Sequence, residues 1–308
     1  MTREISIIVC TYNRASLLAD CLQSLARQTL ARSRCEILVV DNNSSDETRE
    51  VVKKFCREYS NFKVFLETEQ GHSQARNRGW KEAHGRYVAY IDDDCLAESD
   101  WAEKILSSFE EVRPAPSAVG GRILPRYTAT PPAWFADSLE TRSWGKRASF
   151  LTPPADRFGF AGANMAFPRD LLEELGGFSC NFGLVGGKLC MGEDTEFFMR
   201  LAATGHGHFW YDPEIMVKHW TPVELFSLKN RFLRSYLCGC SHYYLETGKV
   251  GRADLRLVLS AFYQLLKGGG CLVQPSGEKM AFLVNSIERA SHQLGVYVES
   301  WVTKRKLC

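Results

Sequence analysis

Apolar runs alternate with amphipathic stretches along residues 5–91 of this chain. The run over 5–10 is nearly all apolar, which is typical of a strand whose two faces are both covered. The next stretch, 15–28, repeats its leucines at helical spacing. The same order continues, with further strands expected at 36–40, 62–66 and 86–91 and further helices around 51–55 and over 71–84. This alternation predicts an α/β fold with a doubly wound, mainly parallel sheet.

Composition narrows the class of protein. The 308 residues are 45% hydrophobic and 24% charged, as in ordinary globular domains. A net charge of +2 gives no sign of a polyanionic partner, so we expect no nucleic acid. The 11 cysteines form no Cys-x-x-Cys pair, and no apolar stretch approaches the ~20 residues that span a bilayer. We therefore expect a cytoplasmic protein with mostly reduced thiols, and the inner face of the cell membrane is the alternative location.

Three successive carboxylates, Asp92, Asp93 and Asp94, follow the apolar run over 87–91. Adjacent carboxylates repel one another, and removing them from water is costly unless a cation compensates. Ligands of open α/β sheets bind at the carboxyl ends of the strands, where hard oxygen atoms suit Mg²⁺ or Mn²⁺. The run therefore predicts a divalent-cation site, and a solvated acidic turn is the alternative.

Polar residues also follow the first two expected strands. Thr11, Tyr12, Asn13 and Arg14 come after the first strand, and Asp41 closes the second. Parallel strands end on one side of a sheet, so a nucleotide could lie across this edge. Asp41 could accept a hydrogen bond from a base, while Thr11 and Tyr12 could pack on the base or ribose. A turn residue and a surface aromatic are the alternatives for Asp41 and Tyr12.

The helix expected over 71–84 carries a further candidate. Gly71 permits a tight turn into this helix, and Arg76 falls within its first two turns. A cation there could meet a diphosphate at the same edge of the sheet. A solvated arginine is the alternative.

Three later segments complete the candidate site. The long connection over 125–156 holds Trp134, Phe135 and Trp144, whose rings could stack on a ligand or form a loop core. The strand-like stretch over 160–167 contains Asn164, and its small residues would let backbone approach a ligand. The glycine-rich segment 181–191 is a candidate lid or acceptor loop.

Several sequence blocks together resemble the signatures of glycosyltransferase family 2. The blocks lie at 8–14, 40–46, 75–79 and 92–94, in the order typical of that family, and the resemblance extends over about residues 4–220. It implies the Rossmann-like GT-A fold and a hexosyltransferase-like, inverting transfer that depends on Mn²⁺ or Mg²⁺. The implied donor is a nucleotide-sugar, with a UDP-sugar favoured. A carbohydrate, a lipid-linked molecule or a protein could be the acceptor, in the synthesis of surface polysaccharide or glycoconjugate.

The resemblance also assigns roles to residues on the donor side. Asp41 would read the base, and Asp92 or Asp93 would contact the ribose or donor sugar. Asp94 would bind the metal, with Asp92 and His219 as further ligands; His219 could instead meet the diphosphate. The block that holds Asn164 would lie beside the donor sugar.

A second acidic pair, Glu193 and Asp194, stands at the expected start of a helix. Acidic residues are common in the first turn of a helix, so ordinary capping is the alternative. By resemblance, Asp194 is the general base that takes the proton of the acceptor hydroxyl, and Glu193 shares acceptor binding.

The character of the chain changes after Pro222. Helices are expected over 224–246, 255–266 and 280–301, followed by the basic end 304–306. We therefore expect a catalytic domain over 1–221 and a helical extension over 222–308. The extension could pack on the catalytic domain, form a homodimer contact or lie on an anionic membrane surface.

Two other functions fit parts of the pattern. Nucleotidyltransferases use similar sheets, but the turn after the first strand lacks a glycine-rich phosphate loop. A non-catalytic subunit that binds a nucleotide-sugar is the other alternative, and the presence of both Asp94 and Asp194 argues against it.

Overall fold

The computed structural model describes most of the chain, namely residues 3–151, 159–185, 188–190, 192–246, 259, 263 and 277–307. The chain divides into two units. The first unit comprises Met1–Leu124, Arg142–Asn181 and Glu193–Trp220. The second comprises Pro125–Thr141, Phe182–Gly192 and Thr221–Cys308. The division at 220 lies beside the expected boundary at 221, but two earlier segments also belong to the second unit.

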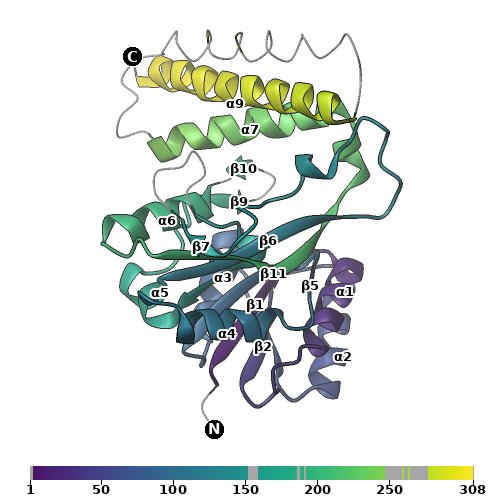
Figure 1. Ribbon diagram of the computed structural model, residues 1–308, viewed down its shortest axis with the longest axis vertical. Coiled ribbons are helices and arrows are strands. Elements are labelled where there is room, and N and C mark those ends of the chain that lie inside the picture. Colours follow the sequence, from purple (N-terminus) through teal and green to yellow (C-terminus); the bar gives the residue numbers. More distant parts are fainter. Residues whose placement is uncertain are drawn as a thin grey trace. The chain divides into compact units, whose positions relative to one another are not determined.

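Four parallel strands form one half of the main sheet (Figure 1). They are β1 (Ile5–Thr11), β2 (Cys35–Asp41), β3 (Phe62–Leu66) and β4 (Tyr87–Asp92), in the spatial order β3-β2-β1-β4. The register pairs Thr11 with Asp41 and Cys10 with Asp92. The polar strand ends therefore meet at one edge, and the predicted α/β fold is confirmed.

The other half of the sheet is antiparallel. Beyond β4 the order continues β8, β6, β11 and β5, with β7 paired to β11. These strands are β5 (Cys95–Ala97), β6 (Ala118–Tyr127), β7 (Ser149–Phe150), β8 (Met165–Pro168) and β11 (Phe209–Thr221). The strand β8 runs antiparallel to both β4 and β6, and β11 runs antiparallel to β5 and β7. The parallel strands predicted from the sequence are thus joined by an antiparallel half that the sequence pattern did not indicate.

The strand β11 continues through Asp212 and Pro213 without a break. The φ angle of proline is compatible with extended backbone, so Pro213 costs the strand only one N–H donor. The next N–H, of Glu214, bonds to the Asp212 carboxylate at 2.8 Å. The strand therefore extends on both sides of Pro213, from Phe209 to Thr221.

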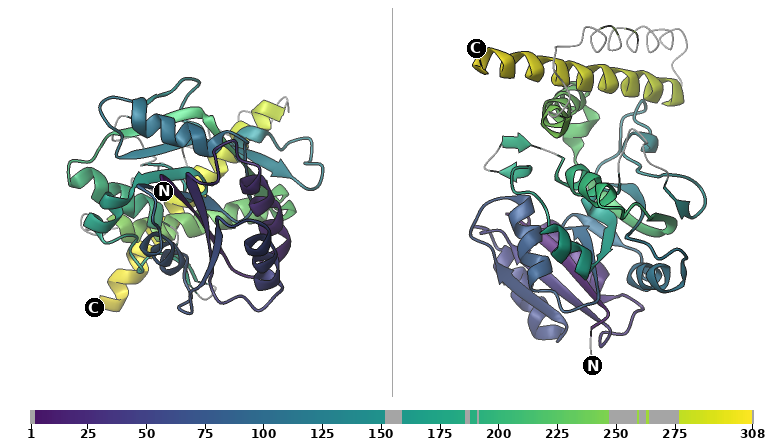
Figure 2. Two further views of the ribbon diagram at one scale, coloured as in Figure 1. Left: turned by 90° about the horizontal axis from the view of Figure 1, so that it is seen from below. Right: turned by 90° about the vertical axis from the view of Figure 1, so that its left-hand side faces the viewer.

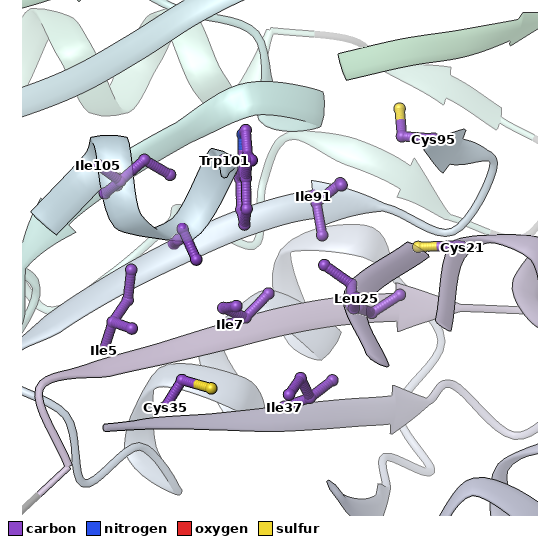
Figure 3. Packing of buried hydrophobic residues seen from close by; sticks show 14 of the residues in the cluster. Ile5, Ile7, Cys21, Leu25, Cys35, Ile37, Ile91, Cys95, Trp101 and Ile105 are labelled. Carbon is purple, nitrogen blue, oxygen red and sulfur yellow. The ribbon is translucent and has the colours of Figure 1, made fainter. Parts of the chain in front are cut away.

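Helices cover both faces of the sheet in the first unit. They are α1 (Ala15–Ala26), α2 (Thr48–Glu58), α3 (His72–Lys81), α4 (Trp101–Glu111), α5 (Arg169–Leu175) and α6 (Glu193–Ala203). One core cluster joins α1, α2 and α4 to the sheet, where Ile7 packs near Leu25 and Trp101 (Figure 3). The other cluster joins α3, α5 and α6 to the opposite face, which Ile8 reaches. This alternation along β1 explains why the strand is apolar throughout.

In the second unit, two helices pack closely against each other. They are α7 (Leu228–Glu246) and α9 (Gly277–Leu307), and in Figure 2 the yellow α9 crosses the light-green α7. A Cβ at Gly239 would collide with the carbonyl of His292. Ser235 Oγ donates a hydrogen bond to the Glu288 carbonyl at 2.7 Å. The helices expected over 224–246 and 280–301 are confirmed. The helix expected over 255–266 lies almost wholly outside the described residues.

A short segment of the long connection packs within the second unit. It contains the 3₁₀ turn η1 (Asp137–Leu139), while a second turn, η3 (Val223–Phe226), precedes α7. Phe135 and Leu139 form a small core with residues of α9. Arg231, fully buried, pairs with Glu140 at 2.7 Å and Glu288 at 2.8 Å. Phe135 is therefore part of a loop core.

The other aromatics of this connection also pack against neighbouring rings. Trp144 packs edge-on against Phe160 in the first unit, with ring centroids 5.3 Å apart. Trp134 is half-buried and contacts the ring of Phe135. The segment expected to be a lid or acceptor loop holds an antiparallel hairpin of β9 (Gly183–Val185) and β10 (Lys188–Cys190), and its role stays a prediction.

None of the described helices combines the length and apolar character needed to cross a membrane.

Candidate active site

The carboxyl ends of β1 and β4 bring Arg14 onto two of the three central aspartates. Its Nη1 lies 3.2 Å from Asp93 Oδ1 and 2.8 Å from Asp94 Oδ2. Both carboxylates are almost fully buried, whereas Asp92 is partly exposed. Burial raises the pKa of Asp93 to about 6 even though Arg14 opposes the shift, and burial also raises the pKa of Asp94. A positive charge beside these buried carboxylates would therefore stabilise their ionised forms.

A candidate metal site lies next to this pair. The ligand atoms of Asp94, Cys95 and His219 all lie within 4.8 Å of one another. His219 Nε2 is 3.3 Å from Asp94 Oδ1 and 4.0 Å from Asp92 Oδ2, and pairing of β11 with β5 sets His219 opposite Cys95. Carboxylate oxygens with an imidazole suit Mn²⁺ or Mg²⁺. Burial raises the pKa of the Cys95 thiol well above its usual value, so this residue suits the metal poorly.

The end of β2 carries an incompletely paired carboxylate. Asp41 is buried, and its Oδ1 accepts a hydrogen bond from the backbone N–H of Ser44 at 2.8 Å. Its Oδ2 is also buried and has no hydrogen-bond partner within the described part of the chain, although Arg49 Nε lies 3.8 Å away. Tyr12 follows Thr11, the β1 residue that pairs with Asp41, and 49% of its surface is exposed. A buried oxygen of this kind is costly unless a ligand donates to it.

Asn13 organises the two loops at this edge. It adopts a positive φ of 53°, which asparagine tolerates better than most residues. Its Oδ1 accepts a hydrogen bond from the backbone N–H of Ser45 at 2.7 Å, and Thr11 beside it is buried. The loops after β1 and β2 are therefore joined, which fixes the positions of their neighbours.

Asp194, the expected general base, is held through both carboxylate oxygens. Arg76 Nη1 makes a short ion pair with Oδ1, and the backbone N–H of Gly162 donates to Oδ2 at 2.8 Å. Burial raises the pKa of Asp194, and the charge of Arg76 opposes this shift. A Cβ at Gly162 would collide with the Arg76 guanidinium, so only glycine leaves room for this arrangement.

Glu193 has a different environment on the same helix turn. Its Oε1 lies 3.1 Å from His72 Nδ1 and 3.3 Å from Arg76 Nη1. Burial alone would raise its pKa, but hydrogen bonding to His72 and the charge of Arg76 lower the pKa to about 2. The two neighbouring carboxylates thus have pKa values shifted in opposite directions.

Arg76 lies deeper than the sequence indicated. Only 3% of its side chain is exposed, and its guanidinium reaches Glu193 and Asp194 and lies 3.8 Å from Asp92 Oδ1. The expectation that it meets a diphosphate directly was based on its place near the start of α3. The structure instead sets it between the two groups of carboxylates, because the 160–164 backbone leaves space for it.

Asn164, expected beside the donor sugar, has its side chain inside the protein. It is 1% exposed; its Oδ1 accepts from Trp101 Nε1 at 2.9 Å. Its Nδ2 donates to the carbonyls of Ile215 at 2.8 Å and Arg122 at 3.2 Å. Both amide hydrogens are therefore used to join the elements around it, and we leave Asn164 out of the proposed donor site. The expected strand also begins later, since Gly162–Asn164 form a 3₁₀ turn.

His72 was missed in the sequence analysis. It is the first residue of α3 and lies four positions before Arg76, so both can contact the same group from one helix face. That spacing was the available signal, but it gave no indication of the partner, Glu193, which is distant in sequence.

Comparisons with known proteins indicate the family to which this chain is similar. A sequence profile of "Glycosyl transferase family 2" matches residues 6–176. Glycosyltransferase AglE of Haloferax volcanii is 37% identical over 105 residues, which make up 34% of this chain and 34% of that protein. The glucosyl-dolichyl phosphate glucuronosyltransferase of the same organism is 27% identical over 232 residues, covering 74% of this chain and 72% of the relative.

A solved structure has a similar fold. It is the mannosyltransferase PcManGT from Pyrobaculum calidifontis, in complex with GDP-Man and Mn²⁺. Its TM-score is 0.64 at 19% identity, with 96% of this chain and 87% of that chain covered. Because the profile matches more than half of the residues, this chain belongs to glycosyltransferase family 2, and its fold is GT-A.

Proposed function

We propose that this protein transfers a sugar from a nucleoside diphosphate sugar to an acceptor hydroxyl with inversion at the anomeric carbon. In this proposal, residues 1–221 are the catalytic domain and 222–308 a helical extension. The observation that carries it is the position of Arg76, which is 3.8 Å from Asp92 and paired with Asp194. Arg76 thus lies close both to a residue expected to act on the donor and to the residue expected to activate the acceptor.

Asp41 supports a uridine donor. Its Oδ1 is engaged by Ser44, which leaves the buried Oδ2 to accept a hydrogen bond from a base. Uracil offers one ring N–H on its pairing edge, whereas guanine offers a ring N–H and an amino group. One available oxygen matches the single N–H of uracil. Tyr12 is exposed enough to stack on the base. The PcManGT neighbour binds GDP-Man, so guanosine is the competing donor to test.

Asp94, Asp92 and His219 would hold Mn²⁺ or Mg²⁺, since their oxygens and imidazole nitrogen match the ligands of these ions. A bound cation would neutralise charge on the departing diphosphate. Arg14 contributes a fixed positive charge to the same carboxylates. The neighbour's complex with Mn²⁺ supports this assignment.

Asp194 is the proposed general base. Burial raises its pKa and so its affinity for a proton, while Arg76 keeps a counter-charge beside the ionised form. Glu193 has a lowered pKa and stays ionised, which suits it to accept hydrogen bonds from acceptor hydroxyls. As the acceptor oxygen attacks opposite the leaving diphosphate, its proton passes to Asp194, and a single displacement inverts the anomeric carbon.

The relative named for glucosyl-dolichyl phosphate supports a lipid-linked acceptor, in synthesis of a surface polysaccharide or glycoconjugate. A free carbohydrate or a protein acceptor is also to be tested. Contact of the C-terminal helices with a membrane or a second copy of the chain stays a prediction.

The test is to incubate the purified protein with Mn²⁺ and UDP-, GDP- and dTDP-sugars. We expect release of nucleoside diphosphate, chiefly UDP, even when water is the acceptor. Release of pyrophosphate would instead indicate nucleotidyl transfer. Binding of nucleotide-sugars without any release would indicate a non-catalytic subunit.

A further inference from the structure

His72 lies between the two groups of carboxylates that define the site. Its Nδ1 is 3.1 Å from Glu193 Oε1, and its Nε2 is 4.0 Å from Asp92 Oδ1. The first distance is that of a hydrogen bond, and the second is too long for one. The imidazole therefore contacts Glu193, and 26% of its side chain is exposed.

The other cation near Glu193 cannot replace this contact. Arg76 is 3.3 Å from Glu193 Oε1, but its shorter ion pair is with Asp194, and the close backbone of Gly162 restricts its movement. A carboxylate that loses a hydrogen-bond donor gains freedom to rotate about its side-chain torsions. A second donor from a helix start restricts those rotations, and His72 is the first residue of α3.

We propose that His72 is a positioning residue for the transfer: it donates a hydrogen bond from Nδ1 that orients Glu193 towards the acceptor hydroxyl. This inference rests on the proposed function. The role belongs to Nδ1, since Nε2 makes no close contact with Asp92. His72 acts through Glu193 and takes no proton from the acceptor; that step belongs to Asp194.

Two substitutions distinguish a role of Nδ1 of His72 from a role of its Nε2. In His72→Asn the side-chain amide lies where Nδ1 lay, whereas in His72→Gln it lies nearer the former Nε2. We expect H72N to release nucleoside diphosphate at close to the wild-type kcat. We expect H72Q and H72L to be slowed ~10- to 100-fold, the loss that corresponds to one charge-assisted hydrogen bond. The donor KM and the affinity for UDP with Mn²⁺ should be unchanged in all three.

His206→Asn is the matched control. His206 belongs to the same unit, and its Nε2 lies 3.5 Å from Glu174, away from the candidate site. The control should keep the wild-type kcat and melting temperature. If H72Q were active and H72N slow, or if all His72 variants were equally active, the proposal would be wrong. A loss of UDP affinity in the His72 variants would also overturn it, since that would make His72 a donor ligand.

A second measurement does not depend on turnover. In protein labelled with ¹⁵N-histidine, the signal of His72 is identified by its absence in H72N. We expect its Nδ1 to carry a proton, and we expect E193Q to shift that signal. An unprotonated Nδ1 would overturn the proposal. If the wild type released no nucleoside diphosphate from any donor, the proposed function would fail, while this spectrum would still decide whether His72 holds Glu193.

Discussion

At the scale of single residues, the adjacent carboxylates of Glu193 and Asp194 have pKa values shifted in opposite directions. Asp194 is bound by Arg76 and Gly162, and burial raises its pKa. Glu193 is bound by His72, and its pKa falls to about 2. Shifts in opposite directions are typical of sites in which one group transfers a proton and its neighbour stays charged.

The role of Asp194 is tested by Asp194→Asn. The amide keeps nearly the same shape but cannot take the acceptor proton, so we expect release of nucleoside diphosphate to fall roughly 100- to 10,000-fold. UDP affinity, measured by calorimetry, should be retained. Asp170→Asn, at an exposed aspartate in the first turn of α5, is the control. A wild-type rate in D194N would remove Asp194 from its assigned role.

The arrangement around Arg76 is tested by Gly162→Ala. The added Cβ would collide with the guanidinium, so Arg76 and Asp194 must move. Misplacement of a catalytic group by an ångström can cost ~100-fold in rate, and we expect a loss of that order in nucleoside diphosphate release. Gly207→Ala is the control, since a Cβ there meets nothing within 4 Å. Equal rates in the two variants would contradict the role given to Arg76.

At the scale of elements, buried ion pairs hold a connecting segment in the second unit. Arg231 of α7 pairs with Glu140 beyond η1 and with Glu288 of α9. Arg234 also pairs with Glu140, at 2.7 Å. Removing one partner of a buried pair leaves an uncompensated charge.

We therefore expect Arg231→Met to lower the free energy of unfolding by about 3 kcal/mol. Chemical denaturation measures this change. Lys229→Met is the control because Lys229 is exposed on the same helix. A change in R231M no larger than in K229M would show that these ion pairs contribute little.

The contact between α7 and α9 also predicts a pH dependence. His242 Nδ1 and His292 Nε2 are 3.2 Å apart, and burial together with His242 lowers the pKa of His292 to about 4. The unfolded chain therefore binds more protons than the folded one between pH ~4 and ~6.5, so stability falls as the pH is lowered through this range.

From pH 7 to 5 this group alone should cost about 1–2 kcal/mol of unfolding free energy. The measurement is the difference in that loss between the wild type and His292→Gln. The variant should lose less stability on acidification. An identical loss in both proteins would show that His292 titrates normally.

At the scale of the whole molecule, all the candidate site residues from Thr11 to His219 belong to the first unit. The parallel half of its sheet was predictable, since each of its strands is a short apolar run followed by a helix. The antiparallel half was not, because β8, β6 and β11 pair across long sequence distances and a proline interrupts the pattern of β11.

The candidate site, too, could be predicted from the sequence only in part. The polar ends of β1, β2 and β4 were predictable from the rule that parallel strands end on one side. The partners of Arg76 and His72 were not, because α6 approaches α3 only in the folded chain. Asn164 was assigned to the donor from its block, but its amide is used by three internal partners that no local pattern reveals.

The most direct test of the account is a crystal of the protein soaked with MnCl₂ and UDP, measured at the manganese absorption edge. We expect an anomalous peak beside Asp94, Asp92 and His219, with Asp194 facing it across the space for a sugar. Manganese bound at another place, or Asp194 turned away from the nucleotide, would contradict it.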